Sequence, residues 1–146
     1  MTEDYKFKLK GTGLIEFHLG CDFFRDEEGV SCFAPRKYID KLIASYERMF
    51  GSKPRTNKIT SPLVKGDHPE IDDSAFLEEE GIQQYQLLIG QLQWAISLGR
   101  FDIAVAITMT MSATMMSAFR SAPRKGHLNR VERICDYLSK MRHSVI

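Results

Sequence analysis

The stretch YQLLIGQLQWAISL, residues 85–98, decides how the second half of this 146-residue chain folds. Its apolar residues recur three, four and seven positions apart, at Tyr85, Leu88, Ile89, Leu92 and Ile96. This spacing places them on one face of an α-helix, and Gly99 provides a helix end. We therefore expect a helix with a buried apolar face, in which Trp94 is a core aromatic residue together with Tyr85.

Two further stretches have the same helical period. Tyr38, Ile39, Leu42 and Tyr46 recur at helical spacing after Pro35, which suits a first helical turn, and this predicts a helix over 35–50. The apolar residues of 126–141 share one face, with Tyr137 as another core aromatic residue, and predict a last helix. A further helix is expected from about Asp102, fading near Phe119.

The first 34 residues have a period of two instead. Apolar residues at 15, 17, 19, 21 and 23 alternate with polar residues or glycine, and the alternation resumes at Val30, Cys32 and Ala34. Between them lies the polar turn 26–29, which ends in Gly29. This pattern predicts a β-hairpin within 1–34. The fold class is therefore α+β, an N-terminal hairpin followed by a mostly helical body over 81–146.

Residues 51–80 have no sustained period and contain three of the five prolines. We expect an irregular acidic linker that is exposed and mobile. The sole Asp-Asp pair, Asp72-Asp73, falls in it without flanking apolar strands. Two-metal polymerase chemistry needs carboxylates in a fixed site, so we interpret this pair as part of a solvated linker and predict no catalytic residue.

Composition limits which classes of protein the chain can belong to. Hydrophobic residues make up 43% of the chain, enough for a core, and no apolar run is long enough to span a bilayer. The charged N-terminus does not fit a signal peptide, so we expect an intracellular protein of cytoplasm or nucleus, with no membrane partner. The cysteines form no C-x-x-C pair and the histidines no ligand spacing, so we predict no metal site.

Charge is segregated although the net charge is only +1. Residues 67–80 hold seven acidic residues and no basic one, whereas residues 120–146 hold seven Lys/Arg against two acidic residues. Basic ends of this kind suit local binding of a polyanion, and an ordinary solvated surface is the alternative.

Several short motifs, in this order, resemble copia-type retrotransposon reverse transcriptases. They are Phe17-His18-Leu19-Gly20, Tyr38-Ile39-Asp40-Lys41-Leu42, Ser61-Pro62-Leu63, Tyr85 to Leu92 (family Tyr-Arg-x-x-Ile-Gly-x-Leu), Arg100-Phe101-Asp102-Ile103-Ala104, Pro123 to His127, and Arg133-Ile134 with Tyr137-Leu138. Their shared order covers about residues 7 to 140. Phe101 and Gln86 depart from the family, which has Pro and Arg there.

The resemblance implies a primer-grip hairpin at the end of the palm (1–34), a first thumb helix (35–50) and a thumb or connection region (81–146). The family's catalytic Tyr-x-Asp-Asp would precede Tyr5 and its ribonuclease H domain would follow residue 146. Polymerase activity of this chain alone is therefore not expected, and Mg²⁺ would be a cofactor only of the intact polymerase. The partners implied are the palm and ribonuclease H domains and a weakly, non-specifically bound primer–template.

A thumb holds duplex mainly through phosphates, so Lys and Arg are the binding candidates. The candidate nucleic-acid-binding residues are Phe17, Leu19, Gly20, Arg36, Lys37, Lys41, Arg48, Arg124, Lys125, Arg130 and Arg133. The alternatives are a host-retained protein-interaction module, using the helical face around 83–98, or a non-functional relic of the element.

Overall fold

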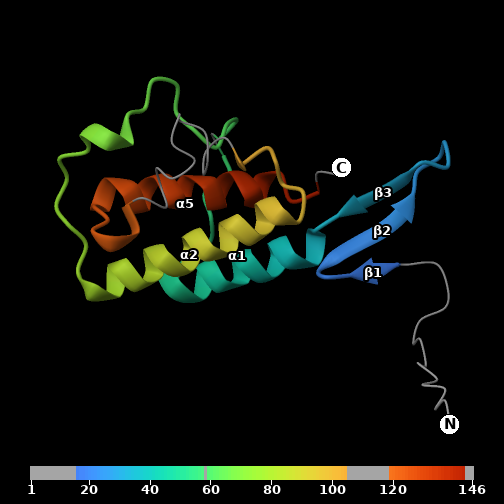
Figure 1. Ribbon diagram of the computed structural model, residues 1–146, viewed down its shortest axis with the longest axis horizontal. Coiled ribbons are helices and arrows are strands. Elements are labelled where there is room, and N and C mark those ends of the chain that lie inside the picture. The colour runs from blue at the N-terminus through green and yellow to red at the C-terminus, as the bar shows by residue number, and fades with distance from the viewer. Residues whose placement is uncertain (1–15, 58, 105–118, 144–146) are drawn as a thin grey trace, which may run out of the picture.

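The computed structural model describes residues 16–57, 59–104 and 119–143 of the chain. Within these residues a small antiparallel sheet comes first and helices α1, α2 and α5 follow, so the predicted α+β class is confirmed. Figure 1 shows the sheet projecting from one end of the helices.

The sheet has three strands, β1 (Phe17–His18), β2 (Cys21–Arg25) and β3 (Ser31–Ala34), in the order β1-β2-β3. The predicted hairpin has its turn at 26–29, and the chain also reverses earlier, at Leu19 and Gly20, which the alternation did not indicate. Both residues have positive φ, 51° and 91°, as a two-residue hairpin turn requires. Alternation alone cannot reveal such a turn when a leucine occupies one of its positions.

The second hairpin turn lies where the sequence predicts it. Asp26 accepts hydrogen bonds from the backbone N–H groups of Glu28 and Val30 at 3.0 and 2.8 Å, which is an Asx-type turn. Gly29 follows with φ of 80°. Strands β2 and β3 then pair in register, with Phe23 opposite Phe33.

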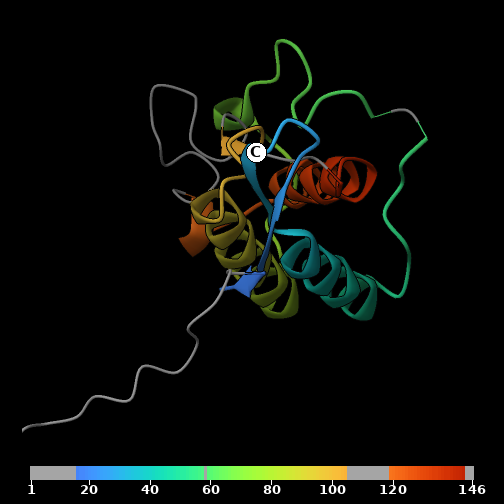
Figure 2. The same cartoon turned by 90° about the vertical axis from the view of Figure 1, so that its right-hand side faces the viewer.

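Helices α1 (Arg36–Phe50), α2 (Glu79–Ser97) and α5 (Lys125–Lys140) pack around one core, and Figure 2 shows them close to end-on. The periodic residues predicted to be apolar faces fill that core. Fully buried side chains include Ile39, Leu42, Tyr85, Leu88, Ile89, Leu92, Val131, Ile134 and Leu138. The predicted helices therefore exist, with α2 starting a little earlier than the apolar period alone suggests.

Trp94 corrects one expectation. Its side chain is 47% exposed, whereas Tyr85 is fully buried and Tyr137 partly buried. Trp94 falls two residues after Leu92, on the outer side of α2, so its size does not bring it into the core. Leu87 on the same helix is also half exposed.

Residues 51–57 and 59–78 form the irregular segment, and several of them are hydrogen-bonded to α5. The Arg55 backbone N–H donates to Asp136 Oδ1 at 2.7 Å, and Lys140 Nζ donates to the carbonyl oxygen of buried Ile59 at 2.8 Å. The chain then follows α5 back toward the start of that helix, as the green trace in Figure 1 shows. The segment is irregular as predicted, apart from one 3-10 turn, Pro69–Ile71.

The helix predicted from Asp102 lies, beyond Ala104, outside the described residues until Phe119. At its start Arg100, only 1% exposed, forms two hydrogen bonds with the Asp102 carboxylate, at 2.9 and 2.6 Å. Burial alone would raise the pKa of Asp102, but hydrogen bonding and the charge of Arg100 outweigh it and hold the pKa below its ordinary value. Arg100 and Asp102 therefore form a structural ion pair at this point of the chain.

Candidate nucleic-acid interface

The first group of candidate residues meets where the sheet joins α1. Lys37 Nζ lies 4.1 Å from the ring centroid of Phe17 and 3.3 Å from Asp22 Oδ1. Arg36 lies with its guanidinium carbon 5.2 Å from the Phe24 ring centroid. Cations over aromatic faces are attracted by the ring quadrupole, so these contacts fix the start of α1 against one face of the sheet.

Leu19 and Gly20 form the tip of that junction. Gly20 has positive φ, and a Cβ there would lie 3.3 Å from Tyr38 Cβ, so the turn packs closely on α1. Leu19 is 64% exposed although its φ of 51° is unfavourable for a leucine.

Along α1 the remaining candidates share one side. Lys37, Lys41 and Arg48 are exposed and are four and seven residues apart, so they line up within a narrow arc of the helix. At 1.5 Å per residue they span about 16 Å. We call these three residues the α1 basic stripe. Asp40, which lies beside the stripe, has its carboxylate 3.9 Å from Arg142.

The second group of candidates lies at the start of α5, which begins at the end of the bundle away from the sheet (Figure 1). Residues 67–77, here named the acidic strap, cross this helix start. The Lys125 backbone N–H donates to the Ala75 carbonyl at 2.9 Å, and that of Gly126 to Ser74 Oγ at 2.8 Å. The strap therefore satisfies N-terminal donors of α5 that lack a local capping side chain at Arg124.

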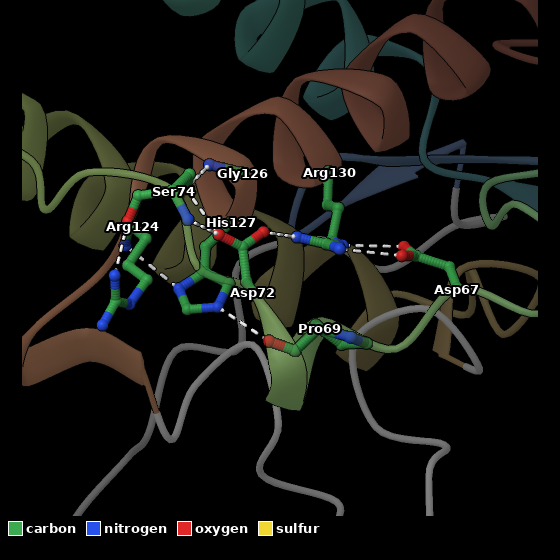
Figure 3. A network of polar contacts seen from close by, with 8 residues as sticks. All are labelled: Asp67, Pro69, Asp72, Ser74, Arg124, Gly126, His127 and Arg130. Carbon is green, nitrogen blue, oxygen red and sulfur yellow. Dashed lines mark hydrogen bonds and ion pairs between the residues drawn. The ribbon is translucent and has the colours of Figure 1, made fainter.

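His127 holds the strap from within the first turn of α5. Its side chain is buried and stacks on Phe119, with ring centroids 4.0 Å apart. Nδ1 accepts the Arg124 backbone N–H at 3.0 Å, so the other nitrogen, Nε2, carries the hydrogen in the neutral ring and faces the Pro69 carbonyl oxygen at 3.0 Å. Figure 3 shows this ring between the strap and the helix.

Arg130 joins the strap to the next turn of α5. Its guanidinium donates to both carboxylate oxygens of Asp67, at 2.7 and 2.8 Å, and also to Asp72 Oδ2 (Figure 3). The Ser74 hydroxyl and then Arg130 lower the pKa of Asp72 to about 2, and the Arg130 hydrogen bond lowers that of Asp67. The Asp72 side chain is only 9% exposed, so the interpretation of this residue as part of a solvated linker was wrong.

The other α5 candidates differ in their surroundings. Arg124 donates to the Ser74 carbonyl at 2.5 Å and lies 4.0 Å over the Phe76 ring centroid, and the Lys125 side chain is exposed. Arg133 lines a cavity of about 500 Å³ between α5 and residues 62–67. Lys65 and Asn129 line the same cavity.

The structure thus brings the candidate residues together in two groups on different elements. One is the sheet junction with the α1 basic stripe, and the other is the α5 start, where Arg130 is already paired. Sequence reasoning missed Lys65 and Asn129. The signal for the strap itself was present, since a run of acids without any cation is complementary to the basic last segment.

Over 16–57, 59–104 and 119–143, no three His, Cys, Asp or Glu side chains are grouped so that they could hold a metal ion. In the same ranges no helix has the length and apolar character needed to cross a membrane.

The chain is 26% identical over 133 residues to the Saccharomyces cerevisiae protein "Putative transposon Ty5-1 protein YCL074W", a match that covers 90% of this chain and 39% of that protein. The chain thus spans about two fifths of that relative's length. No model of a known protein family matches it, and no solved structure does. The similarity is thus to a transposon protein and extends along most of this chain.

Proposed function

We propose that this chain is the part of a copia-type reverse transcriptase that follows the polymerase aspartates, and that it binds primer–template duplex. The observation that carries the proposal is the α1 basic stripe beside the exposed turn at Leu19. The ordered motifs and the similarity to a transposon protein support the same assignment. Specificity for base sequence is not expected, because lysine and arginine on a helix surface meet phosphates.

The cations of the α1 basic stripe suit a nucleic-acid backbone in their spacing, and two of them have no ion-pair partner among the described residues. Its three cations extend for about 16 Å along α1, and each strand of a duplex carries a phosphate per about 3.4 Å of axis, so a strand lying along the helix offers several phosphates. Lys41 has no ion-pair partner among the described residues, and Arg48 bonds only to the Ala44 carbonyl, at 3.4 Å. Both are therefore free to neutralise phosphates.

The sheet supports the same proposal through its exposed apolar side chains. Among the described residues the sheet has three strands, and Phe17, Leu19 and Phe23 are 48%, 64% and 36% exposed on it, with Phe17 and Phe23 on opposite faces. In the intact polymerase, the palm would cover part of the sheet and the turn would face the primer end.

Catalysis by this chain alone is not part of the proposal. Asp72 is engaged by Arg130 and Ser74 while Asp73 is exposed, so the only Asp-Asp pair is not arranged to hold two metal ions. A primer-extension assay with Mg²⁺ or Mn²⁺ is expected to give no product. Template-dependent synthesis by the purified chain would refute this part.

Two matched lysines test duplex binding. Lys41 and Lys53 are both exposed, but only Lys41 belongs to the α1 basic stripe. At low salt Lys41→Ala should weaken binding to a fluorescent primer–template and reduce the salt dependence by about one phosphate contact. Lys53→Ala should leave both unchanged. Equal effects of the two substitutions would show that only net charge matters and would contradict the proposed face.

A second candidate function rests on the outer side of α2. Trp94 and Leu87 are 47% and 50% exposed on one helix, and Trp is typical of protein interfaces. A host-retained interaction module would use this surface. The two functions separate experimentally, because Trp94→Ala should leave duplex affinity unchanged if the α1 basic stripe binds nucleic acid.

A further inference from the structure

The cavity between α5 and residues 62–67 is lined by charged side chains of both signs. They are Arg130 with the two strap carboxylates, Asp67 and Asp72, and also Lys65 and Arg133. The lining therefore holds three cations and two anions, and their pairing decides which ligand the cavity suits.

The two carboxylates are already satisfied. Asp67 receives two hydrogen bonds from Arg130, and Asp72 receives one from Arg130 and two from Ser74, at 3.0 and 2.5 Å. Hydrogen bonds from Arg130, and from Ser74 in the case of Asp72, lower the pKa of both groups, so both are ionised at neutral pH. Arg130 is therefore part of the scaffold of the cavity, with little capacity left for a ligand.

Arg133 is in the opposite situation. It lies three residues after Arg130 on the same side of α5, and its Nε is buried without a hydrogen-bond partner. Among the described residues no carboxylate forms an ion pair with Arg133 or Lys65. Asp136 is an acid three residues further along the helix; its carboxylate accepts the Arg55 backbone N–H, and the charge of Arg133 acts on it without a direct ion pair.

We propose that this cavity binds a phosphate group, with Arg133 and Lys65 as its cations and the Asn129 amide as a neutral donor. Arginine presents a planar fork of donors that matches phosphate oxygens, and lysine adds a point charge. The source of the phosphate rests on the proposed function, under which it is one phosphodiester of the bound nucleic acid. The strap then has a role beyond capping α5, because its pairing with Arg130 leaves Arg133 as the cation that meets the ligand.

Inorganic phosphate tests the site independently of nucleic acid. In an NMR titration, phosphate should shift the Gly66 backbone amide, the Asn129 side-chain amide and the Arg133 Nε–H. These shifts should disappear in Arg133→Ala and Lys65→Ala and persist in Lys53→Ala. Arg133→Lys should bind more weakly than the wild type but more strongly than Arg133→Ala, which a purely structural role for Arg133 would not produce.

The titration overturns the site if phosphate shifts no group in the cavity, or shifts the same groups equally in Arg133→Ala. Amide spectra of each variant show whether the fold is retained. If Arg133→Ala unfolds the chain, Lys65→Ala decides, because Lys65 is exposed and contributes nothing to the core.

Binding to primer–template duplex is the second part of the test. Arg133→Ala should weaken primer–template binding at low salt and lower the log–log salt slope by about 0.9, the value for one phosphate contact. If phosphate binds in the cavity but Arg133→Ala binds duplex as Lys53→Ala does, the nucleic-acid source is overturned and a free phosphate ligand is supported. If the wild type binds no duplex, the proposed function fails, while the phosphate titration still decides the site.

Discussion

Gly126 offers the sharpest test of the docked acidic strap, because two effects of Gly126→Ala have opposite signs. Alanine is a better helix former than glycine by up to about 1 kcal/mol, so the substitution stabilises a helix when nothing is in the way. In this structure a Cβ on Gly126 would overlap Asp72 Oδ2 and lie 2.6 Å from Asp72 Cγ. The carboxylate and the methyl group cannot both occupy these positions.

The expected change in the free energy of unfolding follows from the interactions of Asp72 and Ser74 that the substitution would remove. Lowering the pKa of Asp72 from 3.8 to about 2 corresponds to on the order of 2 kcal/mol of stability at neutral pH. The Gly126 N–H to Ser74 Oγ bond adds about 1 kcal/mol, as a helix cap does. After subtracting the gain in helix propensity, Gly126→Ala should reduce the free energy of unfolding by about 2 kcal/mol.

Urea denaturation monitored by circular dichroism measures this difference, and Gly90→Ala is the matched control. Gly90 lies in α2, and a methyl group added there would meet no atom within 4 Å, so Gly90→Ala should stabilise by about 0.5–1 kcal/mol. In an Asp72→Ala background, Gly126→Ala should become neutral or stabilising. Stabilisation by Gly126→Ala in the wild-type chain, similar to that of Gly90→Ala, would refute the docked strap.

Three further predictions concern charge and backbone strain. Asp72 and Asp67 have lowered pKa values, so they contribute to the free energy of unfolding above about pH 4, and this contribution is lost as the pH falls toward 2. The urea denaturation midpoints of the wild type and Asp72→Asn should therefore converge over that range. Burial raises the pKa of Asp136, beside Glu132, so its ionised form is unfavourable in the folded state. Asp136→Asn keeps an acceptor oxygen and should stabilise by up to about 1 kcal/mol at pH 7, with no gain at pH 3; equal gains at both pH values would argue against a charge effect. Leu19→Asn should stabilise by about 0.5–1 kcal/mol because asparagine tolerates positive φ, and a lower melting temperature would show that Leu19 packs in the isolated chain.

The elements that can be predicted from the sequence are those with a regular local spacing of apolar residues. Helical spacing identifies α1, α2 and α5 and most of their buried faces, because an apolar face must be covered whatever the partner. The turn at Asp26 is also predictable, since its chemistry is local. The reversal at Leu19 is not, because alternation is the same on both sides of a two-residue turn.

Contacts between distant segments account for what the sequence does not predict. Asp67 and Arg130 are 63 residues apart, and a segment without period gives no register from which to pair them. Trp94 shows a related limit, because the outer side of a helix can carry a large apolar residue. The candidate site is therefore predictable as a set of cations, but the division into paired Arg130 and unpaired Arg133 requires the fold.

The salt dependence of wild-type binding to a primer–template duplex tests the central claim most directly. Fluorescence anisotropy should detect binding at low salt, and the logarithm of the association constant should fall linearly with the logarithm of salt concentration. The slope should be about −0.9 for each phosphate neutralised, or about −1.8 for Lys41 and Arg48, the two unpaired cations of the α1 basic stripe. Absence of binding at low salt, or binding that does not change with salt, would contradict the account.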